Sequence, residues 1–199
     1  MSSGTGRRAR RKGVSVERIV DVAIEVLAQG SVDSLTTREV ARRLSISQPT
    51  LYSHVSGLDE IRTLAAIRGV TELSGRVRAA VRGLSGDVAL VAMARAYRGY
   101  VREHPALYML QQRAPWPPEF QEQGLAAAEP VREVLRTYGL TEAQVVHVHL
   151  VFRTSIHGFV DQEINDAISD VSDPDTSFEY FLAILAAGIR SLVSGPDHG

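Results

Sequence analysis

Residues 35–55 read LTTREVARRLSISQPTLYSHV, and they predict two short helices joined by a tight turn. Thr36 precedes Glu39 in a Thr-x-x-Glu pattern, which is typical of a capped helix start, and this helix is expected to end at Leu44. Ser47 is placed to cap the second helix, whose first turn tolerates a proline because that amide has no helical partner. The apolar residues of each helix share one face, so the two helices are expected to pack together.

The second helix of this pair has the form of a DNA-reading helix. An α-helix fits the major groove of B-DNA, where base edges show distinguishable donors and acceptors, and the preceding helix crosses the phosphate backbone. Leu51 and Val55 are expected to be buried. The residues left pointing outward are Gln48, Thr50, Tyr52 and His54. The alternative is a plain helical bundle whose short helices only pack, but the caps, the turn and the polar face together favour a helix-turn-helix.

The rest of the chain is also helical in its apolar spacing, and no stretch alternates as a half-buried strand does, so the predicted fold class is all-α. Ser15 is expected to cap the first helix, and Gly30 to end it in the left-handed conformation. The later helices are expected over about residues 58–73, 87–103, from 105 onward, and 119–138 (with a kink at Pro130). Thr141 and Gln144 are expected to form a capping box for a long helix that reaches about residue 168, and the last helix is expected to begin after Pro174 and to end before Gly195. Residues 114–118 (APWPP) are expected to form a loop.

Composition is that of a soluble globular protein: 44% of the 199 residues are hydrophobic and 23% are charged. The apolar run at residues 181–187 is shorter than the roughly 18 residues of a membrane span, and no signal peptide is expected. The absence of cysteine excludes disulfides and thiolate catalysis and fits the cytoplasm. Charge is uneven: residues 1–56 hold nine Lys or Arg against five Asp or Glu, while residues 141–199 hold two against nine. A basic front suits a polyanionic partner.

The run from Leu35 to Val55 closely resembles the DNA-binding domain of the TetR family of bacterial transcriptional regulators, and the resemblance extends from Val16 to about Ile61. It implies that Thr37 and Arg38 touch phosphate or the groove edge. It also implies that Gln48, Pro49, Thr50 and Tyr52 lie in or beside the major groove, with His54 at a phosphate. One departure is Leu58, where the family usually has a lysine that contacts the backbone. The basic tail is a candidate to compensate for this loss.

The resemblance implies three parts: a basic flexible arm (1–14), a helix-turn-helix domain (15–60) and a helical ligand-binding and dimerisation domain (61–199). Arg10, Arg11 and Lys12 of the arm either form a solvated leader or follow the minor groove of DNA, where arginine is attracted to the more negative channel.

Dimerisation is expected through the last two helices. Residues 145–160 are apolar on nearly all sides, and a helix of that kind must be buried all round. The last helix has one apolar stripe and a second side of small residues that permits close approach of another helix. One subunit lacks enough partners for both helices, so a two-fold four-helix interface is expected.

The candidate effector contacts are mostly aromatic: Tyr100, Tyr108, Trp116, Phe120, Phe152 and His157. Each of these residues can instead be a core residue, and a hydrogen-bonded core position is the alternative for His157. His147 and His149 point in different directions on a helix and lack a spaced carboxylate, so no metal site is expected. No cofactor and no catalytic residues are expected either.

The sequence therefore predicts a homodimeric regulator of an inverted-repeat operator in double-stranded DNA. It is expected to be a repressor, released by a small molecule of unknown class, because most relatives repress; activation is the alternative. A rival interpretation is a helical carrier or enzyme with a vestigial helix-turn-helix, and Leu58 is the one residue that favours it. A second rival keeps DNA binding but replaces the small molecule with a protein partner.

Overall fold

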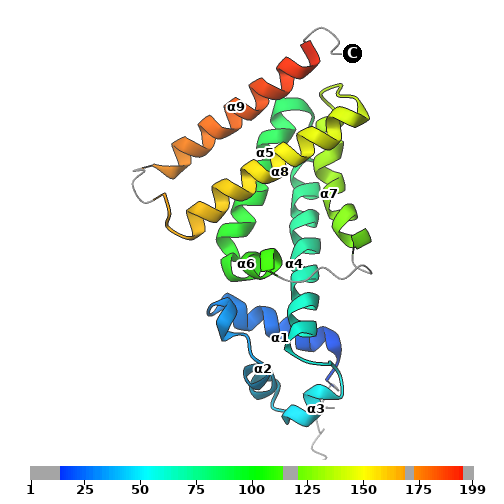
Figure 1. The fold of residues 1–199 in the computed structure, drawn as a ribbon, viewed down its shortest axis with the longest axis vertical. Coiled ribbons are helices and arrows are strands. Elements are labelled where there is room, and N and C mark those ends of the chain that lie inside the picture. Colours follow the sequence, from blue (N-terminus) through cyan, green and yellow to red (C-terminus); the bar gives the residue numbers. More distant parts are fainter. Residues whose placement is uncertain (1–13, 114–120, 169–172, 195–199) are drawn as a thin grey trace, which may run out of the picture.

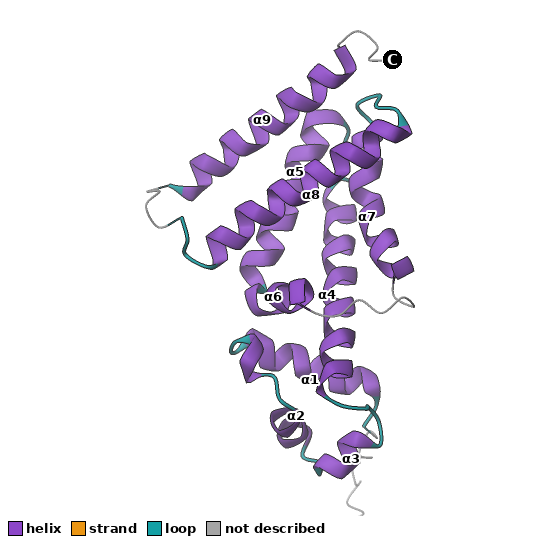
Figure 2. Cartoon of the chain, in the orientation of Figure 1, coloured by secondary structure: helices purple, strands orange, loops and turns teal. Residues whose placement is uncertain are grey.

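The computed structural model describes residues 14–113, 121–168 and 173–194, and every regular element in these ranges is a helix (Figure 2). The all-α prediction is confirmed. The basic arm with Arg10, Arg11 and Lys12, and the APWPP segment, lie outside the described residues.

The N-terminal part of the molecule is a compact group of short helices. Ser15 caps the first one, accepting a hydrogen bond from the Arg18 amide at 3.3 Å as predicted. Gly30 follows this helix but does not adopt the predicted left-handed conformation. Gly30 instead lies close to Ser34: a Cβ at this position would lie 2.6 Å from Ser34 Oγ, so a larger residue would displace that side chain. The elements are α1 (Val16–Ala28), a 3₁₀ turn (Val32–Ser34), α2 (Thr37–Leu44) and α3 (Gln48–Tyr52).

These elements share one apolar core, which we call the reader core. Ile19 and Ala23 of α1, Leu35 and Leu51 are fully buried in it. The core also takes in residues from further along the chain, namely Ile61, Ala65, Ala106, Leu107 and Leu110. The N-terminal group is therefore not closed on itself, because two later helices complete its interior.

Helix α4 (Leu58–Ala80) joins the two halves of the molecule and runs through both (Figure 1). The prediction that it ends near Leu73 is wrong, because the helix continues through Ser74 and Gly75. Burial outweighs the roughly 1 kcal/mol that a glycine costs within a helix: Leu73 and Val77 are both buried in the second core.

The second half consists of α5 (Gly86–Glu103), α6 (Pro105–Arg113), α7 (Gln121–Arg136), α8 (Glu142–Ile164) and α9 (Pro174–Ser194). Thr141 and Gln144 form the predicted reciprocal capping box at the start of α8. That helix ends at Ile164, before the predicted residue 168, and Asp166 then adopts a left-handed turn with φ of 54°.

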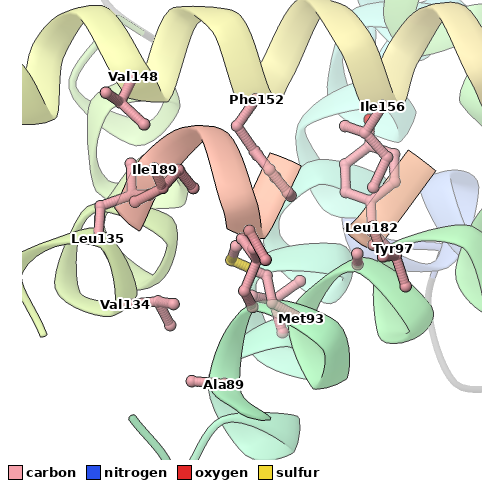
Figure 3. Close-up of a cluster of buried hydrophobic side chains, with 14 of the residues drawn as sticks. Ala89, Met93, Tyr97, Val134, Leu135, Val148, Phe152, Ile156, Leu182 and Ile189 are labelled. Atoms are coloured by element: carbon pink, nitrogen blue, oxygen red, sulfur yellow. The ribbon is translucent and has the colours of Figure 1, made fainter. Parts of the chain in front are cut away.

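A second apolar core, the C-terminal core, lies between α5, α7, α8 and α9. Figure 3 shows Val148, Phe152 and Ile156 of α8 pointing into it, with Met93 and Leu182 among their neighbours. Both cores touch α4, and α6 contributes to each, with Leu107 in the reader core and Tyr108 in the C-terminal core.

Helix α9 departs from the sequence expectation about apolar length. Over Pro174–Val193 it is long and apolar enough to cross a membrane by length and composition alone, and 22% of the most apolar window is buried. Such a helix is weak evidence for a membrane, because partner-facing helices of soluble proteins have the same composition.

Candidate nucleic-acid interface and effector cluster

The α2–turn–α3 unit has the geometry that the sequence predicted. Thr36 accepts a hydrogen bond from the Glu39 amide at 3.1 Å and caps α2. Ser45 then adopts the left-handed conformation with φ of 56°, which turns the chain within three residues. Ser47 caps α3 by accepting from the Thr50 amide at 3.2 Å. Local hydrogen bonds therefore define where each helix begins, and Ser45 makes the turn between them.

The outward face of α3 is polar and lies at the end of the molecule opposite α9 (Figure 1). Leu51 is fully buried and anchors the helix, while Tyr52 is 51% exposed. The Thr50 hydroxyl lies 2.8 Å from Ser47 Oγ, so the cap holds it in place. The other predicted contacts of this helix and its turn that are exposed are Gln48, Pro49 and His54. On α2, Arg38 is exposed and Thr37 is half-buried.

Two further arginines lie in the last turn of α2, and they were not predicted from the sequence. Glu39 accepts from Arg42 at 2.7 Å and from Arg43 at 2.8 Å. These hydrogen bonds lower the pKa of the Glu39 carboxyl to about 2, so it is ionised at neutral pH. The predicted return bond from Glu39 to the helix start is therefore replaced by these ion pairs. Their spacing of three and four residues was the available signal.

The first turn of α4 shows what takes the place of the expected lysine. Leu58 is half-buried and packs against the reader core. Glu60 instead turns back to Ser56, accepting from its amide at 2.6 Å and from its hydroxyl at 2.8 Å. Asp59 lies in the same turn. This helix start is therefore acidic, which weakens its attraction for phosphate.

In the second half, the structure brings together two of the predicted effector residues and adds a third. The hydroxyl of Tyr108 on α6 lies 2.7 Å from Nδ1 of His157 on α8. The hydroxyl of Tyr97 on α5 lies 3.0 Å from Nε2 of the same ring. We call these three residues the effector cluster. Tyr97 was not among the predicted effector residues, because its partner depends on how three helices meet.

Burial determines the protonation of this cluster. It lowers the pKa of His157 to about 4, with Arg153 adding to the effect, so the imidazole is neutral at neutral pH. Burial also raises the pKa of Tyr108 to about 12 and that of Tyr97 well above its ordinary value. The cluster is therefore an uncharged hydrogen-bonding group within the helical half.

The remaining predicted effector residues are placed separately. The buried Tyr100 hydroxyl donates to the carbonyl of Gly69 on α4 at 3.0 Å. Phe152 is 2% exposed and fills the C-terminal core (Figure 3). Trp116 and Phe120 lie outside the described residues.

Two hollows are present on the described part of the helical half. One, of about 330 Å³, lies between α5 and α9, and the other, of about 310 Å³, lies between the end of α4 and α7. Arg95, Arg98 and Arg102 line the first, but these arginines pair with Glu163, Asp175 and Glu179. Neither hollow is lined by the predicted effector residues that the structure describes.

Comparisons with known proteins match both halves. Residues 19–57 match the family described as "Bacterial regulatory proteins, tetR family". Residues 90–185 match the family described as "Tetracyclin repressor-like, C-terminal domain".

Individual relatives extend these matches. The chain is 35% identical over 185 residues to an uncharacterised HTH-type transcriptional regulator of Mycobacterium tuberculosis, covering 92% of this chain and 84% of the relative. It is 51% identical over 39 residues to the class D tetracycline repressor of Escherichia coli, covering 20% of this chain and 18% of that protein. Among solved structures, a TetR variant from Acinetobacter baumannii AYE in complex with minocycline superposes with a TM-score of 0.70 and 22% identity, covering 90% and 98% of the two chains.

Proposed function

Because the chain belongs to the TetR family of bacterial transcriptional regulators, we propose that it is a homodimeric cytoplasmic repressor that a small molecule releases from a palindromic operator. The observation that carries the proposal is the capped α3 helix. Its apolar residue Leu51 is fully buried, and its polar face is exposed at one end of the molecule.

Base reading is assigned to the outward side chains of α3. A Gln48 amide can pair with the donor and acceptor edge of adenine, and Pro49 and Thr50 offer apolar contact to a thymine methyl. Tyr52 lies beside the groove. The phosphate contacts are assigned to Thr37, Arg38 and His54. Arg10, Arg11 and Lys12 are assigned to the minor groove or the adjacent backbone, where they would compensate for Leu58.

Dimerisation is assigned to an exposed apolar surface on the last two helices, which we call the α8–α9 face. Large apolar side chains are 47–71% exposed on it: Val146, Leu150 and Val151 of α8, and Tyr180, Ile184 and Leu192 of α9. Soluble proteins rarely leave such a surface uncovered. A second copy of the chain supplies an identical surface, so a two-fold four-helix bundle covers both. The same pairing accounts for the apolar length of α9.

Effector release is assigned to the helices shared by both halves. Residue 61 of α4 lies in the reader core and residue 77 lies in the C-terminal core, so a change around either core is transmitted along one helix. A small molecule bound near Tyr100, Tyr108, Phe152 and His157 would tilt α4 and change the separation of the two α3 helices. Dimers bind half-sites at fixed spacing, so that change weakens simultaneous binding. The similar Acinetobacter protein has been solved with the small molecule minocycline, which supports a small-molecule effector for this chain.

The division into a basic arm (1–14), a reading domain (15–60) and an effector and dimerisation domain (61–199) is part of this proposal. The rival function is a helical carrier or enzyme with a vestigial reading domain. The acidic start of α4 at Leu58 is the observation that favours it. Family membership favours a regulator, since the TetR family consists of transcriptional regulators rather than enzymes.

The experiment that separates these functions is a genome-fragment selection. The purified full chain is incubated with sheared genomic DNA at physiological salt, and the retained fragments are sequenced. We expect a short palindrome to be enriched, and the genes beside it to narrow the effector. Enrichment of no sequence would refute the repressor and support the carrier.

A further inference from the structure

A band of polar groups crosses the apolar interior in two layers, and the effector cluster is the first of them. The second layer contains Tyr100 and Gln111. Tyr97 and Tyr100 lie one turn apart on α5, and Tyr108 and Gln111 lie one turn apart on α6, so the layers are stacked along both helices. The band lies where the reader core and the C-terminal core meet.

Gln111 is the unusual member of the band. It is 4% exposed, and its amide nitrogen makes no hydrogen bond of standard geometry with a described residue. The amide does interact with the Tyr100 hydroxyl, an interaction that acts to lower the pKa of that phenol. The amide lies against Gly69 of α4, where a Cβ would come within 2.2 Å of the nitrogen. Burying an amide without a partner lowers stability, and most buried polar groups in proteins are paired. An acceptor from outside the chain would satisfy this donor.

The effector cluster also holds a hydrogen that its imidazole does not use. A neutral His157 carries one N–H, and the two phenols each carry one O–H, so the three residues have three polar hydrogens. The Tyr108 contact to Nδ1 and the shorter Tyr97 contact to Nε2 use two of them, whichever ring nitrogen is protonated; Tyr97 Oη also lies 3.3 Å from Nδ1. The third lies on a phenol, where it is available either to the other phenol or to an incoming acceptor.

The band has no charge to offer a charged ligand. Arg98 is the buried charged side chain of the described residues, and it is paired to Glu163 at 2.9 Å on the far side of α5. Arg153 and Asp161 flank His157 with opposite signs, and both are exposed. Glu72 and Arg76 likewise flank Tyr100 with opposite signs, and both are exposed. A carboxylate or ammonium entering the band would be buried without a partner, which is strongly unfavourable.

We propose that the effector is an uncharged, largely apolar molecule with a carbonyl oxygen, which accepts hydrogen bonds from Gln111 and from a phenol of Tyr97 or Tyr108. This inference rests on the effector-release function proposed above and specifies the chemical class of the effector. Tyr and Phe side chains from α5, α6 and α8 supply the apolar contacts.

Helix α6 connects this ligand to the reading domain. Ala106, Leu107 and Leu110 lie on the side of α6 that packs in the reader core. Gln111 and Tyr108 lie on the side that faces the polar band. A carbonyl that draws Gln111 away from Gly69 moves the same short helix that closes the reader core.

The test uses the full chain without DNA and three matched pairs of probes. The pairs are benzophenone with diphenylmethane, 9-fluorenone with fluorene, and 2-acetylnaphthalene with 2-ethylnaphthalene; 2-naphthoate is the charged comparison. Binding is measured by calorimetry and by the shift in thermal unfolding midpoint. We expect at least one ketone to bind about tenfold more tightly than its matched hydrocarbon, because the hydrocarbon leaves the polar groups of the site unpaired. We expect 2-naphthoate not to bind.

The matched variants are Gln111→Met, which keeps the shape and removes the amide, and Gln112→Met at the exposed neighbouring position. Gln111→Met is expected to raise the unfolding midpoint without ligand and to abolish the preference for the ketone. Gln112→Met is expected to change neither. Three results would each overturn the proposal: no ketone preferred over its hydrocarbon, naphthoate bound more tightly than the ketones, or a ketone preference unchanged in Gln111→Met. These measurements need no operator, so they can succeed even where the genome-fragment selection fails. In that case the repressor function would be refuted, while the chemical class of the bound ligand would still be supported.

Discussion

The two ends of the molecule expose opposite chemistry. At the α3 end the exposed residues Gln48 and His54 are polar, and the apolar residue Leu51 is fully buried. At the other end Val151 and Ile184 are large, apolar and 55% and 71% exposed. A polar helix face retains its hydrogen bonds to water until a polyanion replaces them, whereas an apolar face is stable only when covered. This difference is what the proposed function requires, with nucleic acid binding at one end and a second copy of the chain at the other.

The two ends are also built differently. Helix α3 has five residues and depends on the Ser47 cap and one anchoring residue. Helices α8 and α9 have 23 and 21 residues and rest on a large core. Changes at α3 are therefore expected to act locally on DNA recognition, while changes on the α8–α9 face act on assembly.

The largest effect is expected from Ile184→Glu. A charge on the α8–α9 face would be buried without a partner in the dimer, so the chain should become a folded monomer. Operator affinity should fall by roughly 100-fold or more, because two linked half-sites become one. Analytical ultracentrifugation measures the mass, and fluorescence anisotropy measures operator binding.

Leu125→Glu is the matched control for this change. Leu125 is 59% exposed on α7, away from the α8–α9 face. It should leave both mass and affinity unchanged. A dimeric Ile184→Glu variant would show that the subunit interface lies elsewhere and that a second copy does not bind at the α8–α9 face.

The next effect is expected from Gln48→Ala and Thr50→Ala. Loss of a bidentate base contact costs about 1–3 kcal/mol of discrimination, so Gln48→Ala should bind the operator and a scrambled site more equally. Thr50→Ala should show the smaller change, since its hydroxyl already bonds Ser47. Competition binding on paired DNA duplexes measures both. Operator preference retained by both variants would refute the assignment of α3.

Removal of residues 1–12 tests whether the basic arm adds DNA contacts to those of α2 and α3. Each lost phosphate contact should flatten the plot of log affinity against log salt by about 0.9. We expect binding to the operator and to random DNA to weaken alike. A slope equal to that of the full chain would show that the arm is a passive leader.

The smallest effect is expected from the two helix caps, Ser47→Ala and Thr141→Ala. Each should destabilise the chain by about 1 kcal/mol in chemical denaturation. Ser47→Ala should also weaken operator binding, because it releases α3, whereas Thr141→Ala should leave the affinity of the folded protein intact. Equal losses of operator affinity in both variants would contradict the expectation that changes at α3 act on DNA recognition while changes at α8 do not.

Much of the reading domain could be predicted from its sequence because its determinants are local. Thr36 and Ser47 cap within three residues, and Leu51 needs only helical spacing to be placed inside. The reciprocal cap at Thr141 was found in the same way. These are interactions whose partners are close in the chain.

The elements predicted wrongly are those decided by distant residues. The Ser74–Gly75 pair is a weak helix former, and only burial of Leu73 and Val77 keeps it helical. Tyr97 joins His157 across 60 residues, which no local pattern specifies. The effector contacts were therefore harder to predict than the DNA contacts.

Helix α4 also has a mechanical consequence. Its 23 residues form a lever about 34 Å long, with no joint between the two cores. A pivot of about 5° at its upper end carries the lower end through about 3 Å at this length. That displacement is close to the ~3.4 Å rise of one base pair. An operator lengthened by one base pair would shift one half-site by that distance and also rotate it about the DNA axis. The long helix through which we propose that the effector acts would therefore make half-site spacing as strict a requirement as base sequence.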